Sequence, residues 1–485
     1  MAVERSRTGL DRFFKITDRG SSVGREVRGG LVTFVTMAYI VVLNPLIIGS
    51  FSAQDTGAHK DAFGNILPVP QVAAVTALIA GVMTILMGVV ANYPFAMATG
   101  LGINSLIAVS VAPQMSWPAA MGLVLVNGLV IMILVLTGVR TMVFRAVPPA
   151  LKAAIAVGIG LFITLIGLVD AGFVRRIPDA ANTTVPVGLG IDGSIASWPT
   201  LVFVIGLLIT GVLVANRVRG AILIGVLATT VVAIILEAIV KAGPSGGTNP
   251  KGWNLGYPAL PEKIAGMPDL SLLGKVNFDA WVQVPAITAA LIVFTLILTD
   301  FFDTIGTMTG LGKEAGLLNR DGVLPNTGKA LFVDSLGAVA GGAGSSSSNT
   351  MFVESASGIA EGARTGLANV VTGLLFIAAM FFTPLYEVIP VEAAAPALVV
   401  VGALMIGQVR EIDFSDFGIA LPAFLTIVVM PFTYSITNGI GAGFVSYVMI
   451  QVATGGARKV HPLLWIIAVA FVAYFAVGPI RAAIA

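Results

Sequence analysis

Two carboxylates lie inside a long apolar stretch, where charged residues are rare. Asp300 and Asp303 occur in LIVFTLILTDFFDTIGTMTGLG (291–312), whose first nine residues carry no charge. Because these acids are three residues apart, they share one face of a helix, and Thr307 continues that face. Charged groups at membrane depth are costly, so they usually face a bundle interior or a water-filled cavity and mark a functional site.

Two further polar residues follow segments that interrupt apolar sequence. Asn104 lies in NYPFAMATGLGINSLIAVSV (92–111), which proline and two glycines break early. Glu354 follows the run GGAGSSSSN (341–349), and Ser346–Asn349 provide good N-cap residues for a short helix over TMFVESASGIAEG (350–362). We therefore expect Glu354 about one turn inside that helix. Irregular backbone at membrane depth is stable only where protein or a cavity covers it.

The chemistry of this set is that of acids without a matching buried cation. At pH 7 such carboxylates either take up a proton, because desolvation disfavours their charge, or bind a cation. Either property supports coupling to a proton or a sodium gradient. Carboxyl and amide groups also provide the donors and acceptors that a small planar heterocycle requires. The negative potential disfavours an anionic substrate.

Four other acids in or near apolar sequence are given lesser roles. Asp334 is interpreted as a structural partner of a serine hydroxyl or a backbone N–H group. Glu361, Glu387 and Glu392 lie near the ends of apolar runs, where we expect them to be solvated.

Metal and cofactor chemistry is not expected. The chain has no cysteine, so thiolate ligands and cysteine nucleophiles are excluded. Its two histidines, His59 and His461, both lie outside the apolar runs. The net charge of +2 gives no reason to expect a nucleic-acid partner.

The composition places these residues in an integral membrane protein. Of 485 residues, 56% are hydrophobic and 11% are charged, whereas soluble domains carry about 25% charged residues. The apolar runs have the length of membrane helices and not that of barrel strands. We predict an all-α polytopic protein with fourteen spans, at 30–50, 70–91, 97–113, 119–138, 149–169, 199–215, 220–240, 285–311, 328–342, 350–361, 366–383, 394–409, 416–431 and 438–454.

Loop charge sets the predicted orientation. Arginine and lysine follow the even-numbered spans, and the short loops after odd-numbered spans are poor in both. By the positive-inside rule the N-terminus is cytoplasmic, and we expect no cleavable signal peptide. A further apolar run at 462–481 either spans the membrane or lies at its surface.

Fourteen spans divide into two halves of seven, which must enter the membrane from opposite sides. This is the topology of an inverted repeat, common in secondary transporters. The two interrupted segments are the third spans of their halves, and such matched interruptions indicate a transporter binding site.

Two other classes of protein fit the acids less well. A cation-selective channel would use rings of acids, but here the acids are unevenly placed. An intramembrane aspartyl protease needs carboxylates on facing helices, and this chain places both aspartates on one helix without a GxGD sequence.

Four segments resemble the AzgA-like purine permeases of the nucleobase–cation symporter-2 group, also called nucleobase–ascorbate transporters. They are DRFFKITDRGSSVGREVRGGLVTFVTMAYIVVLNP (11–45), TDFFDTIGTMTG (299–310), SSSSNTMFVESASGIAEGARTGLANVVTGLLF (345–376) and PAFLTIVVMPFTYSITNGI (422–440). The resemblance covers almost the whole chain. It implies import of adenine, guanine or hypoxanthine with protons across the plasma or inner membrane, by an elevator-like movement of a core domain against a gate domain. It also implies a homodimer formed through the gate domain.

The domain boundaries that the resemblance implies follow the predicted spans. They are a cytoplasmic segment at 1–28, the first half of the core domain at 29–145 (spans 1–4), the first half of the gate domain at 146–242 (spans 5–7), an extracellular linker at 243–283, the second half of the core domain at 284–384 (spans 8–11), the second half of the gate domain at 385–456 (spans 12–14) and a C-terminal hydrophobic segment at 457–485.

The site residues that the resemblance implies lie on spans 3, 8 and 10. Asp303 and Glu354 match carboxylates that face the base in the wider group, while Asp300 and Asn104 match polar positions of the AzgA-like branch. We expect Asp303, Glu354 and Asp300 to hold the coupling proton as well. Where relatives that carry pyrimidines or xanthine have Glu followed by His, this chain has Asp303 and Thr304, which favours adenine, guanine or hypoxanthine. The remaining predicted contacts are Thr307, Thr350 and two rings that could stack on the base, Phe352 and Phe302.

Overall fold

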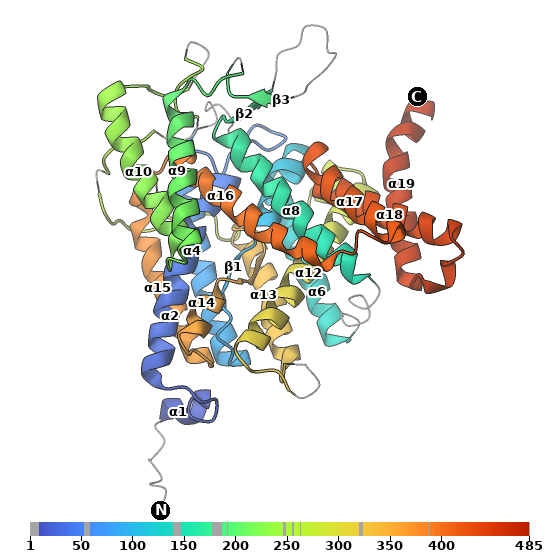
Figure 1. Cartoon of the computed structure of the whole chain (residues 1–485), viewed down its shortest axis with the longest axis horizontal. Coiled ribbons are helices and arrows are strands. Elements are labelled where there is room, and N and C mark those ends of the chain that lie inside the picture. The colour runs from blue at the N-terminus through green and yellow to red at the C-terminus, as the bar shows by residue number, and fades with distance from the viewer. Residues whose placement is uncertain are drawn as a thin grey trace, which may run out of the picture.

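The computed structural model shows a mostly helical protein (Figure 1). It describes residues 9–484 except 53–58, 139–146, 177–186, 192, 246–248, 255–256, 262, 320–323 and 387. In the described chain, nine helices are long and apolar enough to cross a membrane, and four shorter apolar helices accompany them. The chain is therefore a multi-pass membrane protein.

The first half of the chain contains the first broken segment. Its elements are α1 (Gly9–Phe14), α2 (Val23–Met37), α3 (Ile40–Ile48), α4 (Val69–Leu86), η1 (Met87–Ala91), β1 (Met97–Thr99), α5 (Leu101–Leu106), η2 (Ile107–Val111), η3 (Ala112–Gln114), α6 (Trp117–Leu136), α8 (Pro149–Asp170), β2 (Val174–Arg176), β3 (Val187–Leu189), α9 (Trp198–Ala215) and α10 (Ala221–Val240).

The second half contains the other broken segment and the long helix with the two aspartates. Its elements are α11 (Ala280–Gln283), α12 (Ala286–Glu314), α13 (Thr327–Ala343), β4 (Asn349–Met351), α14 (Ser355–Ala360), α15 (Gly366–Ala379), η4 (Met380–Leu385), α16 (Val391–Met405), η5 (Ile406–Glu411), α17 (Phe417–Phe432), α18 (Ile436–Ala453), η6 (Ala457–Lys459) and α19 (Pro462–Ile484).

Most predicted spans coincide with helices to within a few residues, but the first begins earlier. Helix α2 starts at Val23 and not at residue 30, because the Ser22 side chain accepts from the backbone N–H of Arg25 and caps it. Glu26, in its first turn, is fully buried and accepts hydrogen bonds from the backbone N–H groups of Arg364 and Thr365. The basic N-terminal sequence therefore enters the folded protein sooner than hydropathy indicates.

The helices pack in two groups. The first group contains α2, α3, α4, α6, α12, α13, α14 and α15, and the second contains α8, α9, α10, α16, α17 and α18. Within the first group α4 and α15 touch along their backbones, since a Cβ on Gly81 would lie 2.7 Å from the Gly373 carbonyl oxygen. Small residues permit such close approach in membranes, where packing and not the hydrophobic effect holds helices together.

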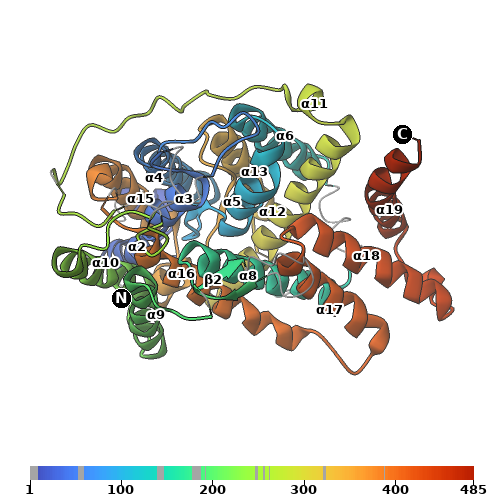
Figure 2. The same ribbon diagram turned by 90° about the horizontal axis from the view of Figure 1, so that it is seen from above.

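Helix α19 lies at the edge of the molecule, beside α18 (Figure 2). Phe471 is fully buried and forms aromatic contacts with Phe294 of α12 and Phe444 of α18. On its other face Ile466 and Val469 are exposed. The predicted apolar run at 462–481 is thus a continuous helix with one packed face and one apolar outer face.

Candidate functional site

The two broken segments meet through backbone hydrogen bonds. Strands β1 and β4 pair in antiparallel register, with Ala98 opposite Thr350. Just past the ladder, the backbone N–H of Phe352 donates to the carbonyl of Ala96 at 3.0 Å. Both strands are fully buried. The two unwound segments therefore satisfy part of each other's backbone groups, and Thr84 Oγ1 bonds both the N–H and the carbonyl group of Met97. Burial inside a membrane protein requires such partners.

This pairing corrects one prediction. The helix expected over 350–362 begins only at Ser355, and Glu354 occupies its N-cap position and not its first turn. Ser346–Asn349 do not cap a helix, because the chain from Asn349 to Met351 is extended and bonded to β1. The serine run instead turns the chain back from α13, with positive φ at Ser345 (56°) and Ser347 (72°).

Asp300 is buried between two elements that donate hydrogen bonds to it. Its Oδ2 accepts from Asn127 Nδ2 of α6 at 2.9 Å and from the hydroxyl of Ser348 at 2.7 Å. This carboxyl group thus connects α12 to α6 and to the start of β4.

A second polar cluster lies one turn further along α12. Thr304 Oγ1 donates to Asp334 Oδ2 of α13 at 2.8 Å and lies 2.8 Å from Thr350 Oγ1 of β4. All three side chains are buried. Asp334 thus accepts from threonine hydroxyls, whereas the sequence predicted a serine hydroxyl or a backbone N–H group as its partner.

Asp303 differs from its neighbours because its side chain is exposed. It lies within electrostatic reach of Asp300, Asp334 and Glu354, so four carboxyl groups from three segments gather around this part of α12. Thr307 is partly buried one turn along the same helix. Asp303 thus lies among these carboxyl groups and has greater solvent exposure than Asp300 or Asp334.

Glu354 has one satisfied and one unsatisfied oxygen. The hydroxyl of Tyr39, between α2 and α3, donates to its Oε1. Its Oε2 is buried, and no described residue bonds it. A buried carboxyl oxygen without a partner is costly, so it marks a position where a donor from a ligand or water would be favourable.

Two buried amide oxygens near the strands also have no hydrogen-bond partner among the described residues. Asn104 is fully buried and donates from Nδ2 to Thr99 Oγ1 at 3.2 Å. Within the described chain, its Oδ1 and that of Asn349 have no hydrogen-bond partner. The sequence predicted Asn104, and the structure adds Asn349, Tyr39 and Asn127. Asn127 was not predicted, and the signal that could have identified it is a lone asparagine inside the apolar sequence of α6.

The two predicted aromatic contacts have different outcomes. Phe352 is only 8% exposed and belongs to the main hydrophobic cluster. The side chain of Phe302 lies outside the part of the chain that the structure describes. Among the described residues, no group of three or more His, Asp or Glu side chains is arranged to hold a metal ion.

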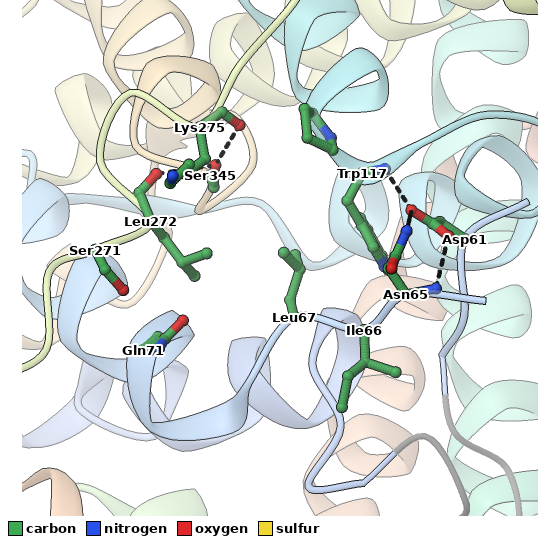
Figure 3. A pocket seen from close by; sticks show the side chains of 11 residues that line it. Asp61, Asn65, Ile66, Leu67, Gln71, Trp117, Ser271, Leu272, Lys275 and Ser345 are labelled. Carbon is green, nitrogen blue, oxygen red and sulfur yellow. Dashed lines mark hydrogen bonds between the residues drawn. The ribbon is translucent and has the colours of Figure 1, made fainter. Parts of the chain in front are cut away.

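A separate cavity of about 270 Å³ lies between loops, and none of the predicted site residues lines it (Figure 3). Asp61 Oδ2 accepts from the Trp117 backbone N–H at 3.1 Å, and Ser345 Oγ donates to the Leu272 and Lys275 carbonyls at 3.2 Å. These bonds fasten the loops around the cavity to α6 and to the end of α13.

Two acids expected to be solvated are buried instead. Glu392, in the first turn of α16, is fully buried and accepts from the backbone N–H of Asn254 at 2.8 Å. Glu361, just after α14, has a side chain only 8% exposed and contacts two arginines. Hydropathy placed both near span ends but does not reveal that loops fold over them. Glu387 lies outside the described residues.

Comparison with known proteins identifies the family. The model described as "Permease family" matches residues 24–442. The chain is 38% identical over 473 residues to the guanine/hypoxanthine permease PbuG of Bacillus subtilis, covering 96% of this chain and 99% of that protein. It is 35% identical over 467 residues to the adenine permease AdeQ of Escherichia coli, covering 95% of each.

Solved structures agree on the fold. The transmembrane domain of the cyanobacterium bicarbonate transporter BicA is 15% identical and covers 86% of this chain and 96% of its own, with a TM-score of 0.58. The structure of SLC26A9 gives the same score at 12% identity, over 92% of this chain and 67% of its own. The predicted resemblance is thus confirmed by full-length relatives, and the chain belongs to the Permease family of membrane transporters.

Proposed function

We propose that this protein imports purine nucleobases of the adenine, guanine and hypoxanthine class by proton symport. One observation carries the proposal: a buried, unpartnered Glu354 oxygen and the exposed Asp303 lie beside the paired strands of two broken segments, within the described chain. No Lys or Arg occurs between Val284 and Lys313 or between Lys329 and Arg364 to neutralise the acids. The named purine permeases among the relatives support the substrate class.

In this proposal the base lies between α12 and the strands. Glu354 Oε2 accepts a purine N–H, and the amide oxygens of Asn104 and Asn349 are further acceptors within the same buried region. Asp303 binds a second edge of the base or carries the coupling proton, while Asp300 and Thr350 hold the surrounding shell. Because the site has acceptors in excess of donors, a protonated carboxyl group improves its match to a neutral purine.

The proposed architecture is fourteen spans in a seven-plus-seven inverted repeat, with the N-terminus in the cytoplasm. The two packing groups correspond to the core and gate domains at the boundaries given above, and they support that division. The strand pair β1–β4 joins the third spans of the two halves within the core. The core moves against the gate in an elevator-like manner, and two copies associate through the gate in the plasma or inner membrane.

Uptake measurements test the proposal. Cells that lack their own permeases and express this chain should accumulate radiolabelled adenine, guanine or hypoxanthine, but not uracil. A protonophore should abolish accumulation, whereas replacing external sodium should not. Failure to take up any nucleobase would overturn the proposed function, and ion conductance in planar bilayers would then favour a channel. Uptake that requires sodium would mean that sodium is the coupling ion, and the proposed substrate class would stand.

A further inference from the structure

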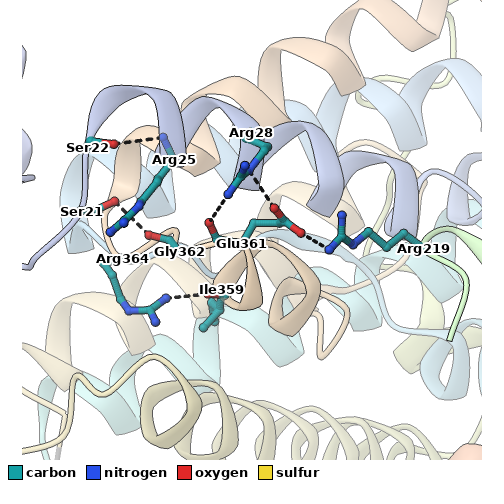
Figure 4. A network of polar contacts seen from close by, with 9 residues as sticks. All are labelled: Ser21, Ser22, Arg25, Arg28, Arg219, Ile359, Glu361, Gly362 and Arg364. Atoms are coloured by element: carbon teal, nitrogen blue, oxygen red, sulfur yellow. Dashed lines mark hydrogen bonds and ion pairs between the residues drawn. The ribbon is translucent and has the colours of Figure 1, made fainter.

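Glu361 forms an ion-pair cluster between the two packing groups (Figure 4). Its Oε2 lies 2.7 Å from Arg28 Nε, and its Oε1 contacts Arg219 Nη2. The carboxylate is 8% exposed, whereas the side chains of the two arginines are 63% and 66% exposed. One buried acid is thus shared by two cations from different parts of the chain.

Arg28 and Glu361 belong to the same packing group. Helix α2 packs directly on α14, since a Cβ on Gly29 would lie 2.8 Å from the Gly358 carbonyl oxygen. Arg28 also donates from Nη2 to the Glu361 carbonyl at 3.3 Å. A movement of one group against the other would leave this pair intact.

Arg219 comes from the other group. It precedes α10, which packs on α9 and α16. Next to it Gly220 has φ +69° and lies against α2, where a Cβ would come within 2.6 Å of Val35 Cγ1. The connection between α9 and α10 therefore rests on the boundary between the groups, and its ion pair with Glu361 crosses that boundary.

We infer that the Arg219–Glu361 ion pair is a latch that stabilises the conformation seen here and opens during transport. This inference rests on the proposed function, since it requires the two groups to move. Arg28 makes such a latch reversible. When Arg219 withdraws, Glu361 still pairs with Arg28. The buried carboxylate therefore never lacks a cation, a state that would be strongly unfavourable. Because both arginines are largely exposed, the latch is weak and sensitive to salt.

The absence of cysteine permits a direct test in the purified, membrane-reconstituted protein. Gly310 is exposed, lies on the Asp303 face of α12 and has open space around it, so Gly310→Cys provides a single reactive thiol. Its reaction rate with a water-soluble maleimide should fall by about two- to fivefold when Arg219→Ala is added, the range expected for a weak ion pair. The matched variant Arg28→Ala should not lower the rate, because Glu361 would then have no cation when Arg219 withdraws, which favours the closed latch. Equal rates in the two variants would overturn the latch.

Cross-linking provides a second measurement. In Arg219→Cys/Glu361→Cys a short, reducible bifunctional thiol reagent should stop uptake, and reduction of the cross-link should restore it. The same reagent on Arg28→Cys/Glu361→Cys joins residues of one group and should leave uptake unchanged. Transport that continues across the 219–361 cross-link would exclude the latch. Absence of uptake in the protein before cross-linking would instead count against the proposed function, while the labelling comparison would still decide the latch.

Discussion

The hydroxyl of Ser348 lies 2.7 Å from Oδ2 of Asp300, so the last residue of the serine run is bonded to the middle of α12. Asn127 of α6 donates to the same oxygen. The broken segment is thus fixed to the long helix by a buried carboxyl group. This bond is one of the contacts that position β4, and with it Glu354.

Ser348→Ala should therefore destabilise the protein and reduce uptake. Removing one donor from a buried carboxylate costs about 1–3 kcal/mol. Ser347→Ala is the matched control, because Ser347 is equally buried and no described residue bonds its hydroxyl. Thermal unfolding in detergent checks the difference. Equal losses in the two variants would mean that burial of the serine run, and not this bond, matters.

Thr304→Val should also be destabilising, by about 1–3 kcal/mol, because valine keeps the shape of threonine but removes the bond to buried Asp334. Thr295→Val offers a comparison in the same helix. Thr295 is fully buried as well, but its hydroxyl donates to the Leu291 carbonyl of its own helix. We expect a clearly smaller loss there. The measurement is the denaturation midpoint of each variant. Equal decreases for Thr304→Val and Thr295→Val would mean that the Thr304–Asp334 bond does not contribute to stability.

Glu354→Gln should abolish hypoxanthine uptake or uncouple it from the proton gradient, because glutamine cannot exchange a proton. Tyr39→Phe should keep coupling and weaken binding, since it removes only the donor to Oε1. Exposed Glu411 at the end of η5 provides the control, and Glu411→Gln should transport normally. The measurement is uptake with and without a protonophore. Normal pH-driven accumulation by Glu354→Gln would remove its assigned role.

Gly341→Ala should prevent correct folding. A Cβ at this position in α13 would lie 1.8 Å from the Ser347 carbonyl oxygen, so the turn into β4 would have to move. Overpacking of this kind typically costs about 1–3 kcal/mol or more. Gly310→Ala, where nothing lies within 4 Å of the new methyl group, should be tolerated. Yield of monodisperse protein after detergent extraction distinguishes the two.

Acid should destabilise the loop that contains His59. Burial lowers the pKa of His59 from 6.5 to about 4, so the folded protein keeps it neutral while the unfolded chain protonates it first. Its contribution to stability is present above pH 6.5 and is lost as the pH falls toward about 4. The thermal midpoint should drop over this range, and His59→Gln should flatten the profile. An identical pH profile in that variant would contradict the assignment.

The sequence was sufficient to predict the membrane helices and the two broken segments. Long apolar runs predict helices because a helix satisfies its own backbone hydrogen bonds within the lipid. Asp300 and Asn104 could be selected because a polar residue in such a run has few reasons to be there. The same reasoning applied to Asn127 would have identified the donor to Asp300.

What could not be predicted depends on contacts between distant segments. Hydropathy and the N-cap residues predicted a helix from residue 350. Neither pattern contains information on β1, whose backbone bonds β4 and keeps this segment extended. Glu361 is predicted to be solvated because it lies near the end of a span. Its position in the sequence does not show that Arg28 and Arg219, which are far away in the chain, contact it. Tyr39 was missed because a tyrosine in an apolar run is usually explained by packing alone.

The β1–β4 ladder also has a consequence for biosynthesis. Thr99 pairs with Asn349, so its partner is translated roughly 250 residues later. Until then, while the second half is still being translated, β1 has no partner strand, and the lipid offers no hydrogen-bonding groups in its place. The candidate site draws residues from both halves, so neither half of the polypeptide contains it alone.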